Sequence, residues 1–523
     1  MSAPVPPPVP ASAPSPAPAP DRKERRNQEF ARRKQDKARR RKEMRGLRET
    51  GEAPPAPPAV SNAKCQAASI EEEARDRQEG AASYLKAMER HLPWIYSQFA
   101  RINDPRQAKK VKHRIALTLL FGLLTFLFQK ESRRRANAEL TTPALLEVLR
   151  TLFPDIASLP HHGTVNRVLA EIDVSELQDI HLDLVRRLLR MKAFRRYRNG
   201  GYYTVAFDGT QKASLHDLWA GECLEAKSGD AARYYCYVLE ASIAVGNGIA
   251  LPLMTEFCEY DLGKNDKQDC EYRAFERLAA RLMREFPRLK IMAVVDGLYA
   301  SAPVFQLLLD NGWTFMINLR ENSLPLVWEE YKALEEAYRR EGRKQVFEGR
   351  QRWGGRQQHF TWINNIEYSP DNGRRTFRLH VVVCHERWLE PGAAAGSPAE
   401  KPRTFSWISS NAIALKNVHF RCNLCARHRW CIEEQFLVEK HHGYHYEHLF
   451  SRDWNAMNGY HCLMRMAHFL NELAIACAHV APRIAQRGRA GFFRWLMVTL
   501  CGRWLDLAAL REELSKPYQL RTA

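Results

Sequence analysis

Two aspartates in this sequence each follow a run of strand-forming apolar residues and precede a glycine. Asp208 lies at the end of the segment GYYTVAFDG, and Asp296 lies at the end of KIMAVVDG. Carboxylates at the ends of neighbouring strands project from one edge of a sheet, where they can share Mg²⁺, a hard cation that prefers oxygen ligands. A pair of such ions can activate the attacking oxygen and stabilise the leaving oxygen in a displacement at phosphorus. The two aspartates therefore predict a metal-dependent phosphoryl-transfer site.

Such a site needs a third acid, and the helical segment RWCIEEQFLVEK supplies one. Arg429, Glu433 and Lys440 are separated by four and seven residues. At about 100° per residue, this spacing places all three on one face of a helix. An acid flanked by two cations suits a metal ligand beside groups that hold phosphate. Glu434 points about 100° away from Glu433 on the same helix, so it is the weaker candidate.

The elements that must position these acids follow a recognisable order. The strand that leads to Asp208 comes first, and two β-rich runs at 234–257 follow it, joined by the hairpin signal Gly246–Asn247–Gly248. A helix that Asp269 can cap, the strand that leads to Asp296, a helix at 301–312 and a strand at 313–319 complete the series. This is the order of an RNase H-like α/β core with a mixed sheet.

Composition divides the remaining chain into further regions. Residues 320–415 interrupt the core with a charged helical stretch at 326–343, then β-rich runs and a low-complexity loop at 390–402. The apolar run from Ile115 to Phe128 is too short to span a bilayer and predicts a buried helix. We expect four regions: a disordered Pro/Ala-rich and basic tail at 1–64, a helical domain for DNA binding or dimerisation at 65–198, a catalytic domain at 199–480 with a β-rich insertion at about 320–415, and a C-terminal helical segment at 481–523.

The charge of the chain points to a polyanionic partner. Its 79 Lys and Arg outnumber its 60 Asp and Glu, which gives a formal net charge of +19. Residues 22–48 hold fourteen of the basic residues and four of the acidic ones, so both the tail and the body are basic. Nucleic acid is the commonest partner of such a surface. The twelve cysteines are scattered and follow no secretory signal, so we expect reduced thiols in the cytoplasm and no membrane partner.

From about residue 200 to 480 the sequence resembles the DDE transposases of bacterial insertion sequences. The resemblance rests on the core order, both Asp-Gly strand ends and a β-rich insertion before the third acid. It also rests on the family's signature of Tyr, Arg, Glu and Lys at intervals of three, four and seven, which Arg429, Glu433 and Lys440 fit. Ala426 stands at the Tyr position and removes one expected phosphate contact. The segments at 159–169, 263–271 and 441–448 also resemble one subgroup of these enzymes.

The resemblance implies a fold, a reaction and a set of partners. Asp208, Asp296 and Glu433 would bind Mg²⁺, with Mn²⁺ as a substitute, while Arg429 and Lys440 would hold the DNA backbone. The enzyme would bind double-stranded DNA at the ends of a mobile element as a homodimer or a larger synaptic complex. It would cut each end to free a 3′-hydroxyl, which then attacks target DNA, at the nucleoid of the cell.

Several alternatives stay open on the sequence alone. The chain could be an RNase H-like nuclease that only hydrolyses DNA, or a non-catalytic DNA-binding descendant of a transposase. Cys422 and Cys425, with His428 and Cys431 nearby, have the spacing of a partial zinc site. Two tryptophans of the insertion, Trp353 and Trp362, could stack on an unpaired base or fill a small core of the insertion. The helical region could also be a structural cap on the catalytic domain.

Overall fold

The structure is a computed structural model, and it describes most of the chain from residue 67 onward. The described residues are 67–228, 231–245, 249–259, 267–341, 347–353, 356–370, 374–388 and 403–518, with 31, 35, 38, 45 and 46 as isolated positions. Contacts divide the chain into Met1–Leu47 and Arg48–Ala523, and every element named below belongs to the second unit. The hairpin turn at 246–248, the loop at 390–402, the side chain of Asp269 and nearly all of the basic tail lie outside the described residues.

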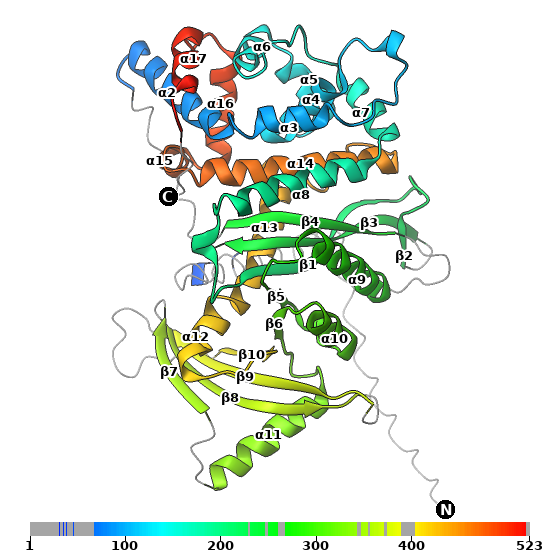
Figure 1. Cartoon of the computed structure of the whole chain (residues 1–523), viewed down its shortest axis with the longest axis vertical. Helices are drawn as coiled ribbons and strands as arrows, with labels where there is room; N and C mark the ends of the chain where they lie inside the picture. The colour runs from blue at the N-terminus through cyan, green and yellow to red at the C-terminus, as the bar shows by residue number, and fades with distance from the viewer. Residues whose placement is uncertain are drawn as a thin grey trace, which may run out of the picture. The chain divides into compact units, whose positions relative to one another are not determined.

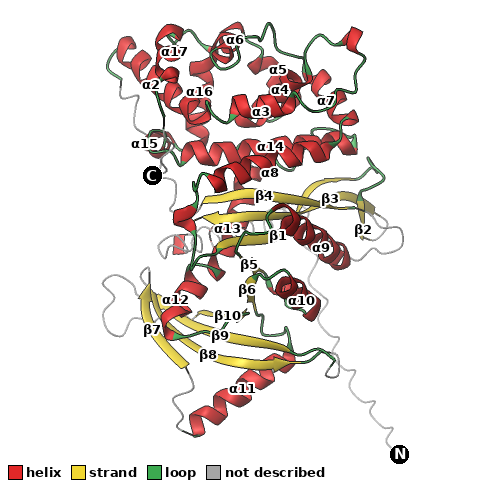
Figure 2. Cartoon of the chain, in the orientation of Figure 1, coloured by secondary structure: helices red, strands yellow, loops and turns green. Residues whose placement is uncertain are grey.

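Ten strands in the described part of the chain form one mixed sheet (Figures 1 and 2). Their order is β2-β3-β1-β5-β6-β10-β9-β8-β7, and β4 also pairs with β3. β1, β5 and β6 are parallel neighbours, and the other pairings are antiparallel. The strands are β1 Tyr203–Leu215, β2 Leu224–Ser228, β3 Ala231–Val245, β4 Ile249–Cys258, β5 Ile291–Val295, β6 Thr314–Asn318, β7 Phe347–Trp353, β8 Arg356–Tyr368, β9 Phe377–Trp388 and β10 Arg403–Ser409. The predicted mixed α/β architecture is confirmed.

The parallel centre of the sheet follows directly from the sequence. All five residues of β5 are buried, as expected for a short apolar strand that is covered on both faces. β1 was expected to end at Asp208, and this was wrong: β1 continues to Leu215. The reason is its partner, because β3 pairs with β1 as far as Leu215 opposite Tyr234, whereas the pairing with β5 stops at Ala206 opposite Val294.

The interruption at 320–415 extends the central sheet. β10 pairs antiparallel with β6, and β9, β8 and β7 follow outward from it. The predicted charged helix is α11 (Pro325–Arg340), and its Tyr331 hydroxyl lies 2.9 Å from the Thr361 hydroxyl on β8. Trp362 of β8 is buried in an apolar cluster on one face of the sheet, whereas Trp353 of β7 is half-buried and lies near the His419 ring.

Helices cover the sheet and form the part of the molecule drawn at the top of Figure 1. α9 (Lys267–Glu285) packs against β3 and β4, and α10 (Ala302–Asp310) packs against β6. α12 (Leu415–Asn423) and α13 (Trp430–His441) follow β10 along the chain. The other helices come from both ends of the chain. They are α2 Ile70–Met88, α3 Leu92–Phe99, α4 Ile115–Leu127, α5 Arg133–Leu140, α6 Pro143–Arg150, α7 His162–Glu171, α8 Val174–Arg190, α14 Trp454–Ile475, α15 Ala481–Arg487, α16 Arg489–Cys501 and α17 Leu507–Ser515.

α14 is the helix that joins this layer to the sheet. Eighteen of its 22 residues are buried, and it contacts the helices α4, α7 and α8 as well as the strand β4. All thirteen residues of α4 are buried, so the buried helix predicted at 115–128 is confirmed. Among the described residues, no helix is both long and apolar enough to cross a membrane.

Candidate functional site

Asp208 and Asp296 lie next to each other on parallel strands. Ala206 on β1 is opposite Val294 on β5, and each aspartate follows two residues later. Side chains two residues apart in a strand point to the same face, so both aspartates project from the face that Ala206 and Val294 occupy. The side chain of each aspartate is 22% exposed.

The alternation of side chains also determines which element meets the aspartates. Ala206 and Val294 belong to a buried apolar cluster that includes Ile432 and Phe436 of α13 (Trp430–His441). The alternate residues of these strands, such as Phe207 between Ala206 and Asp208, point to the other face of the sheet. There they join the cluster against which α9 and α10 pack. The same apolar pattern that builds β1 and β5 therefore brings the start of α13 to the face that carries the two acids.

The glycine after each aspartate allows a close approach by a neighbour. A side-chain Cβ at Gly209 would lie 2.4 Å from the Tyr237 hydroxyl oxygen, and one at Gly297 would lie 3.0 Å from the carbonyl oxygen of Asn318. β1 continues past Asp208, so Gly209 does not serve to make a turn. Close packing next to the two acids explains the glycine in each Asp-Gly pair.

Asp208 lies in a crowded, electronegative position. Burial raises its pKa to about 7; Arg429 opposes that shift, while Glu433, Asp296 and Glu271 reinforce it. Its Oδ1 accepts a hydrogen bond of 3.0 Å from the backbone N–H of Gly209. Mutual repulsion among carboxylates is the condition that a divalent cation relieves, because its charge favours their ionised forms.

Asp296 is fixed by its own backbone and by one cation. It caps the short 3₁₀ helix η3 (Gly297–Tyr299), where its Oδ1 accepts from the N–H of Leu298 at 2.8 Å. Its Oδ2 accepts from an Nη2 group of Arg320 at 2.9 Å. Arg320 follows the end of β6, so the third parallel strand also contributes to the site.

Arg429 links the helix-borne acid to the strand-borne ones. It closes the 3₁₀ helix η4 (Ala426–Arg429), which leads into α13. Its Nη2 donates to Glu433 Oε1 at 2.6 Å, and its Nη1 lies 3.6 Å from Asp208 Oδ2. The structure therefore brings Asp208, Arg429 and Glu433 together, with Arg429 between the two carboxylates.

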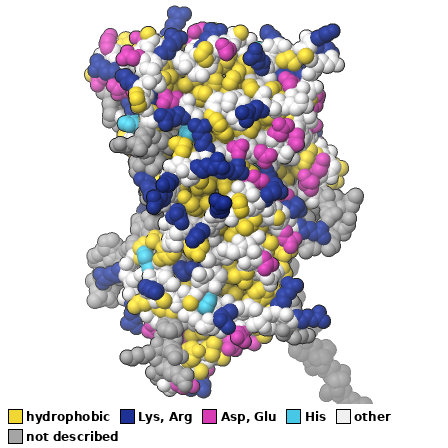
Figure 3. Space-filling view, viewed as in Figure 1, with side chains coloured by type: hydrophobic (Ala, Val, Ile, Leu, Met, Phe, Trp, Pro, Cys, Tyr) yellow, Lys and Arg dark blue, Asp and Glu magenta, His cyan; other side chains and the backbone are white. Residues whose placement is uncertain are grey.

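Lys440 lies apart from this group. It follows Arg429 by eleven residues, which corresponds to about 16 Å along a helix axis. Its Nζ lies 3.1 Å from Glu447 Oε1 and above the ring of Tyr446. Lys440 is therefore paired with Glu447 and, within the described residues, has no ion pair with Asp208, Asp296 or Glu433. Figure 3 shows other Lys and Arg side chains gathered near the middle of the face in view.

A buried ion cluster fixes the start of α13. Glu386 on β9 accepts from Arg427 of η4 and from Arg356 of β8, each at 2.8 Å, and all three side chains are 1% exposed. The Arg427 guanidinium also lies 4.2 Å from the ring centre of Phe405. Arg427 is two residues from Arg429, so this cluster ties the outer strands of the sheet to the helix that carries Glu433.

A second buried ion cluster fixes the end of α13. Glu439 is fully buried and lies 2.6 Å from both Arg465 and His468 of α14. Burial alone would raise the pKa of Glu439, but Arg465 and His468 hold it below its ordinary value. Arg465 also lies 3.2 Å from Glu240 on β3. This cluster therefore joins α13, α14 and the sheet.

The candidate acids suit a hard divalent cation by their chemistry. Asp208, Asp296 and Glu433 offer carboxylate oxygens, the ligands that Mg²⁺ and Mn²⁺ prefer. In the part of the chain that the structure describes, no group of three or more His, Cys, Asp or Glu is arranged to hold a metal ion. Glu433 instead pairs with Arg429, whose charge lies between the carboxylates, so Glu433 must leave Arg429 before three acids can share one ion.

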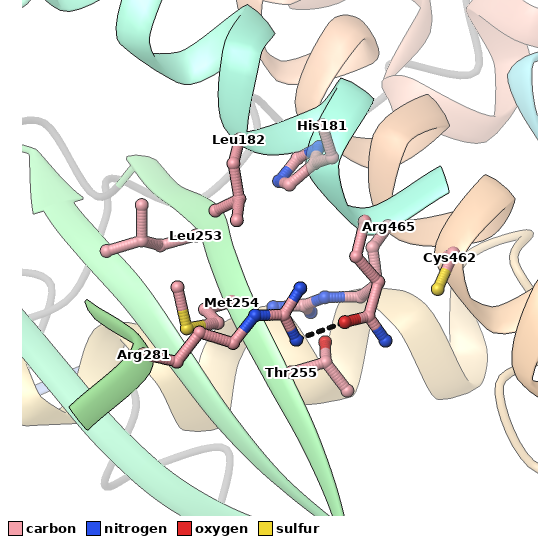
Figure 4. A pocket seen from close by; sticks show the side chains of 9 residues that line it. His181, Leu182, Leu253, Met254, Thr255, Arg281, Cys462 and Arg465 are labelled. Atoms are coloured by element: carbon pink, nitrogen blue, oxygen red, sulfur yellow. Dashed lines mark hydrogen bonds between the residues drawn. The ribbon is translucent and has the colours of Figure 1, made fainter. Parts of the chain in front are cut away.

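Two other features of the molecule lie outside this arrangement. Cys422 and Cys425, the pair with zinc-like spacing, are fully buried in the apolar cluster under the sheet. A small pocket between α8, β4, α9 and α14 is lined by side chains that include His181, Thr255 and Arg465 (Figure 4). None of the five candidate site residues lines this pocket.

Sequence reasoning missed three residues around the acids. They are Arg320, which pairs with Asp296; Glu271 on α9, whose charge acts on Asp208; and Glu386, which anchors Arg427. Glu271 ends the segment 263–271, which predicted a helix start and resembles one subgroup of transposases but gave Glu271 no role of its own. Glu386 and Arg427 are 41 residues apart, and their pairing depends on how β9 meets η4. The sequence held no clear signal for Glu386, because the polar residues His385 and Arg387 flank it at the end of β9.

Two family models match parts of the chain. Residues 249–470 match the Transposase DDE domain, and residues 96–185 match a model described as DDE_Tnp_1-associated. Together the matches support a DDE-family transposase. Asp296, Arg429, Glu433 and Lys440 lie within the matched range, and Asp208 precedes it. No curated protein matches the sequence.

Proposed function

We propose that this chain is the transposase of a bacterial insertion sequence, with an RNase H-like catalytic core. The strand order β4-β3-β1-β5-β6, with β3 antiparallel and β1, β5 and β6 parallel, supports this core. The observation that carries the proposal is the placement of Asp208 and Asp296 on adjacent parallel strands, with Arg429 and Glu433 brought to the same face by α13.

Asp208, Asp296 and Glu433 would hold divalent cations, Mg²⁺ or Mn²⁺, at this face. Bound there, the ions would supply activation of the attacking oxygen and stabilisation of the leaving oxygen. Arg429, released from Glu433, has its guanidinium free for a phosphate oxygen, which it can contact through two parallel N–H groups. Lys440 would hold the flanking backbone, in a contact that weakens with salt.

The reaction proceeds by two displacements at phosphorus. In the first, water attacks the phosphodiester at the element end; the P–O bond to the 3′-oxygen breaks, the 3′-oxygen takes a proton, and a 5′-phosphate remains. In the second, the freed 3′-hydroxyl loses its proton and attacks a phosphodiester of target DNA, whose own 3′-oxygen leaves. Positioning and charge stabilisation carry both steps, and no covalent enzyme intermediate is needed.

Cleavage of DNA that carries the inverted repeats flanking the gene tests this proposal. The wild type should cut at the repeat ends when Mg²⁺ or Mn²⁺ is present, and Asp208→Ala, Asp296→Ala and Glu433→Ala should each abolish the cut. Cleavage without joining of the freed ends to target DNA would favour a hydrolytic nuclease. Tight binding of the repeats without any cleavage would favour a non-catalytic DNA-binding protein.

A further inference from the structure

A buried glutamate lies behind the two aspartates. Glu271 on α9 is 4% exposed and accepts hydrogen bonds from two tyrosine hydroxyls. The Tyr237 hydroxyl donates to its Oε2, and the Tyr299 hydroxyl donates to its Oε1, each at 2.9 Å. One carboxylate therefore joins a residue of β3 to a residue of η3.

Each tyrosine contacts the backbone next to one aspartate. Tyr237 packs over Gly209, the residue after Asp208, so closely that only a glycine fits beneath its hydroxyl. Tyr299 ends the 3₁₀ turn that Asp296 caps, and its backbone N–H donates to the Asp296 carbonyl oxygen at 3.2 Å. The bridge from Tyr237 through Glu271 to Tyr299 thus spans both strands that carry the acids.

A buried carboxylate is an unusual choice for a bridge between two tyrosine hydroxyls. Removing an ionised carboxylate from water is unfavourable, so a bridge with only a packing role would favour apolar side chains. The negative charge of Glu271 also acts on Asp208 and adds to the repulsion among the acids. That repulsion raises the free energy of the metal-free site, and a bound divalent cation relieves it.

We propose that Glu271 is a positioning residue for the metal-binding aspartates, which it holds in register through Tyr237 and Tyr299 while its charge strengthens their affinity for divalent cations. The inference rests on the proposed function, because it concerns the same site. Glu271 acts through its neighbours, since both of its carboxylate oxygens accept from tyrosine hydroxyls.

Binding of Mn²⁺ to the full-length protein without DNA, followed by electron paramagnetic resonance of the free ion, tests the inference. Glu271→Gln keeps the size of the side chain and removes its charge. It should weaken Mn²⁺ binding by about tenfold, the low end of the range for groups bonded directly to metal ligands, because Glu271 acts through two tyrosines. Glu276→Gln is the matched control, because Glu276 lies on the same helix and is exposed. It should bind Mn²⁺ like the wild type.

Cleavage kinetics separate positioning from general damage. Tyr299→Phe removes one hydroxyl and keeps the charge of Glu271; it should lower kcat with KM for DNA unchanged and with the wild-type circular dichroism spectrum. If Glu271→Gln binds Mn²⁺ like Glu276→Gln, or Tyr299→Phe cuts DNA like Glu276→Gln, while the wild type binds Mn²⁺ and cuts DNA, the inference alone is overturned. If the wild type neither binds Mn²⁺ nor cuts DNA, the proposed function fails, and the inference fails with it.

Discussion

The strand-borne and helix-borne halves of the candidate site are fixed by different forces. Asp208 and Asp296 take their places from the register of two buried parallel strands, and each accepts a hydrogen bond from a backbone N–H one or two residues on. Glu433 has a side chain that is 37% exposed and pairs with Arg429. The strand half is therefore set by main-chain geometry, whereas the helix half depends on where α13 lies.

The position of α13 depends in turn on two buried ion clusters. Glu386 holds its start through Arg427, and Glu439 holds its end through Arg465 and His468. Buried ion pairs are weak sources of net stability, yet removal of one partner is strongly destabilising because a buried charge is left alone. The side chain of Glu433 can therefore turn on an anchored helix, whereas each aspartate is held by its own backbone.

The largest effect is expected from the strand half. Asp296→Asn keeps the shape of the side chain and removes a carboxylate that we propose as a metal ligand, so cleavage should fall by about a thousandfold or more, since a lost charge stabilisation of several kcal/mol corresponds to that factor. Single-turnover cleavage of repeat-end DNA measures it. Asp310→Asn, at an exposed acid on α10, should cut at the wild-type rate. Equal rates for the two variants would remove Asp296 from the site.

Loss of the anchor at the start of α13 should affect stability. Glu386→Gln leaves Arg356 and Arg427 buried without their counter-charge, and the free energy of unfolding should fall by about 3–5 kcal/mol. Denaturant unfolding measures this change. The control is Glu336→Gln, which breaks an exposed pair with Arg340 and should change stability by less than about 1 kcal/mol. Similar values for both variants would contradict the anchoring role of Glu386.

The charge on Asp208 should make stability depend on pH when no metal is present. Its pKa is raised to about 7 by burial, from an ordinary value of 3.8, so the folded state keeps a proton that the unfolded state loses. Stability should therefore fall by up to a few kcal/mol as pH rises from about 4 to 7. Thermal unfolding in EDTA measures the trend. Asp208→Asn should have a flatter profile over that window, and identical slopes would show that Asp208 does not titrate there.

The smallest effect is expected at Lys440, which lies far from the acids. Lys440→Ala should weaken DNA binding severalfold and reduce the salt slope of binding by about one, the signature of one lost phosphate contact. Fluorescence anisotropy at several salt concentrations measures both. Lys332→Ala, at an exposed position on α11, should leave the slope unchanged. An unaltered slope for Lys440→Ala would assign Lys440 to its ion pair with Glu447 alone.

The parts of the fold that apolar patterns dictate were predictable. The continuous apolar run of β5 and the run at 115–128 predicted a buried strand and a buried helix, and both are present. The charged stretch at 326–343 predicted a helix, which is α11. Such elements depend on their own side chains, so their sequence is sufficient evidence for them.

What the sequence could not supply was pairing between distant residues. The length of β1 depends on β3, the bridge through Glu271 depends on how α9 lies against β3, and the link from Arg429 to Asp208 spans more than two hundred residues. Spacing alone suggested that Lys440 shares a site with Glu433, but only the structure gives Lys440 its partner Glu447. Local periodicity carries no information about these contacts.

A crystal structure of the full-length protein soaked with Mn²⁺, with the anomalous signal of the ion recorded, tests the central claim most directly. We expect Mn²⁺ within coordination distance of Asp208 and Asp296, with the Glu433 carboxylate turned away from Arg429 and toward the ion. An ion bound elsewhere, with Glu433 still paired to Arg429 at saturating Mn²⁺, would contradict the assignment of these three acids as one metal site.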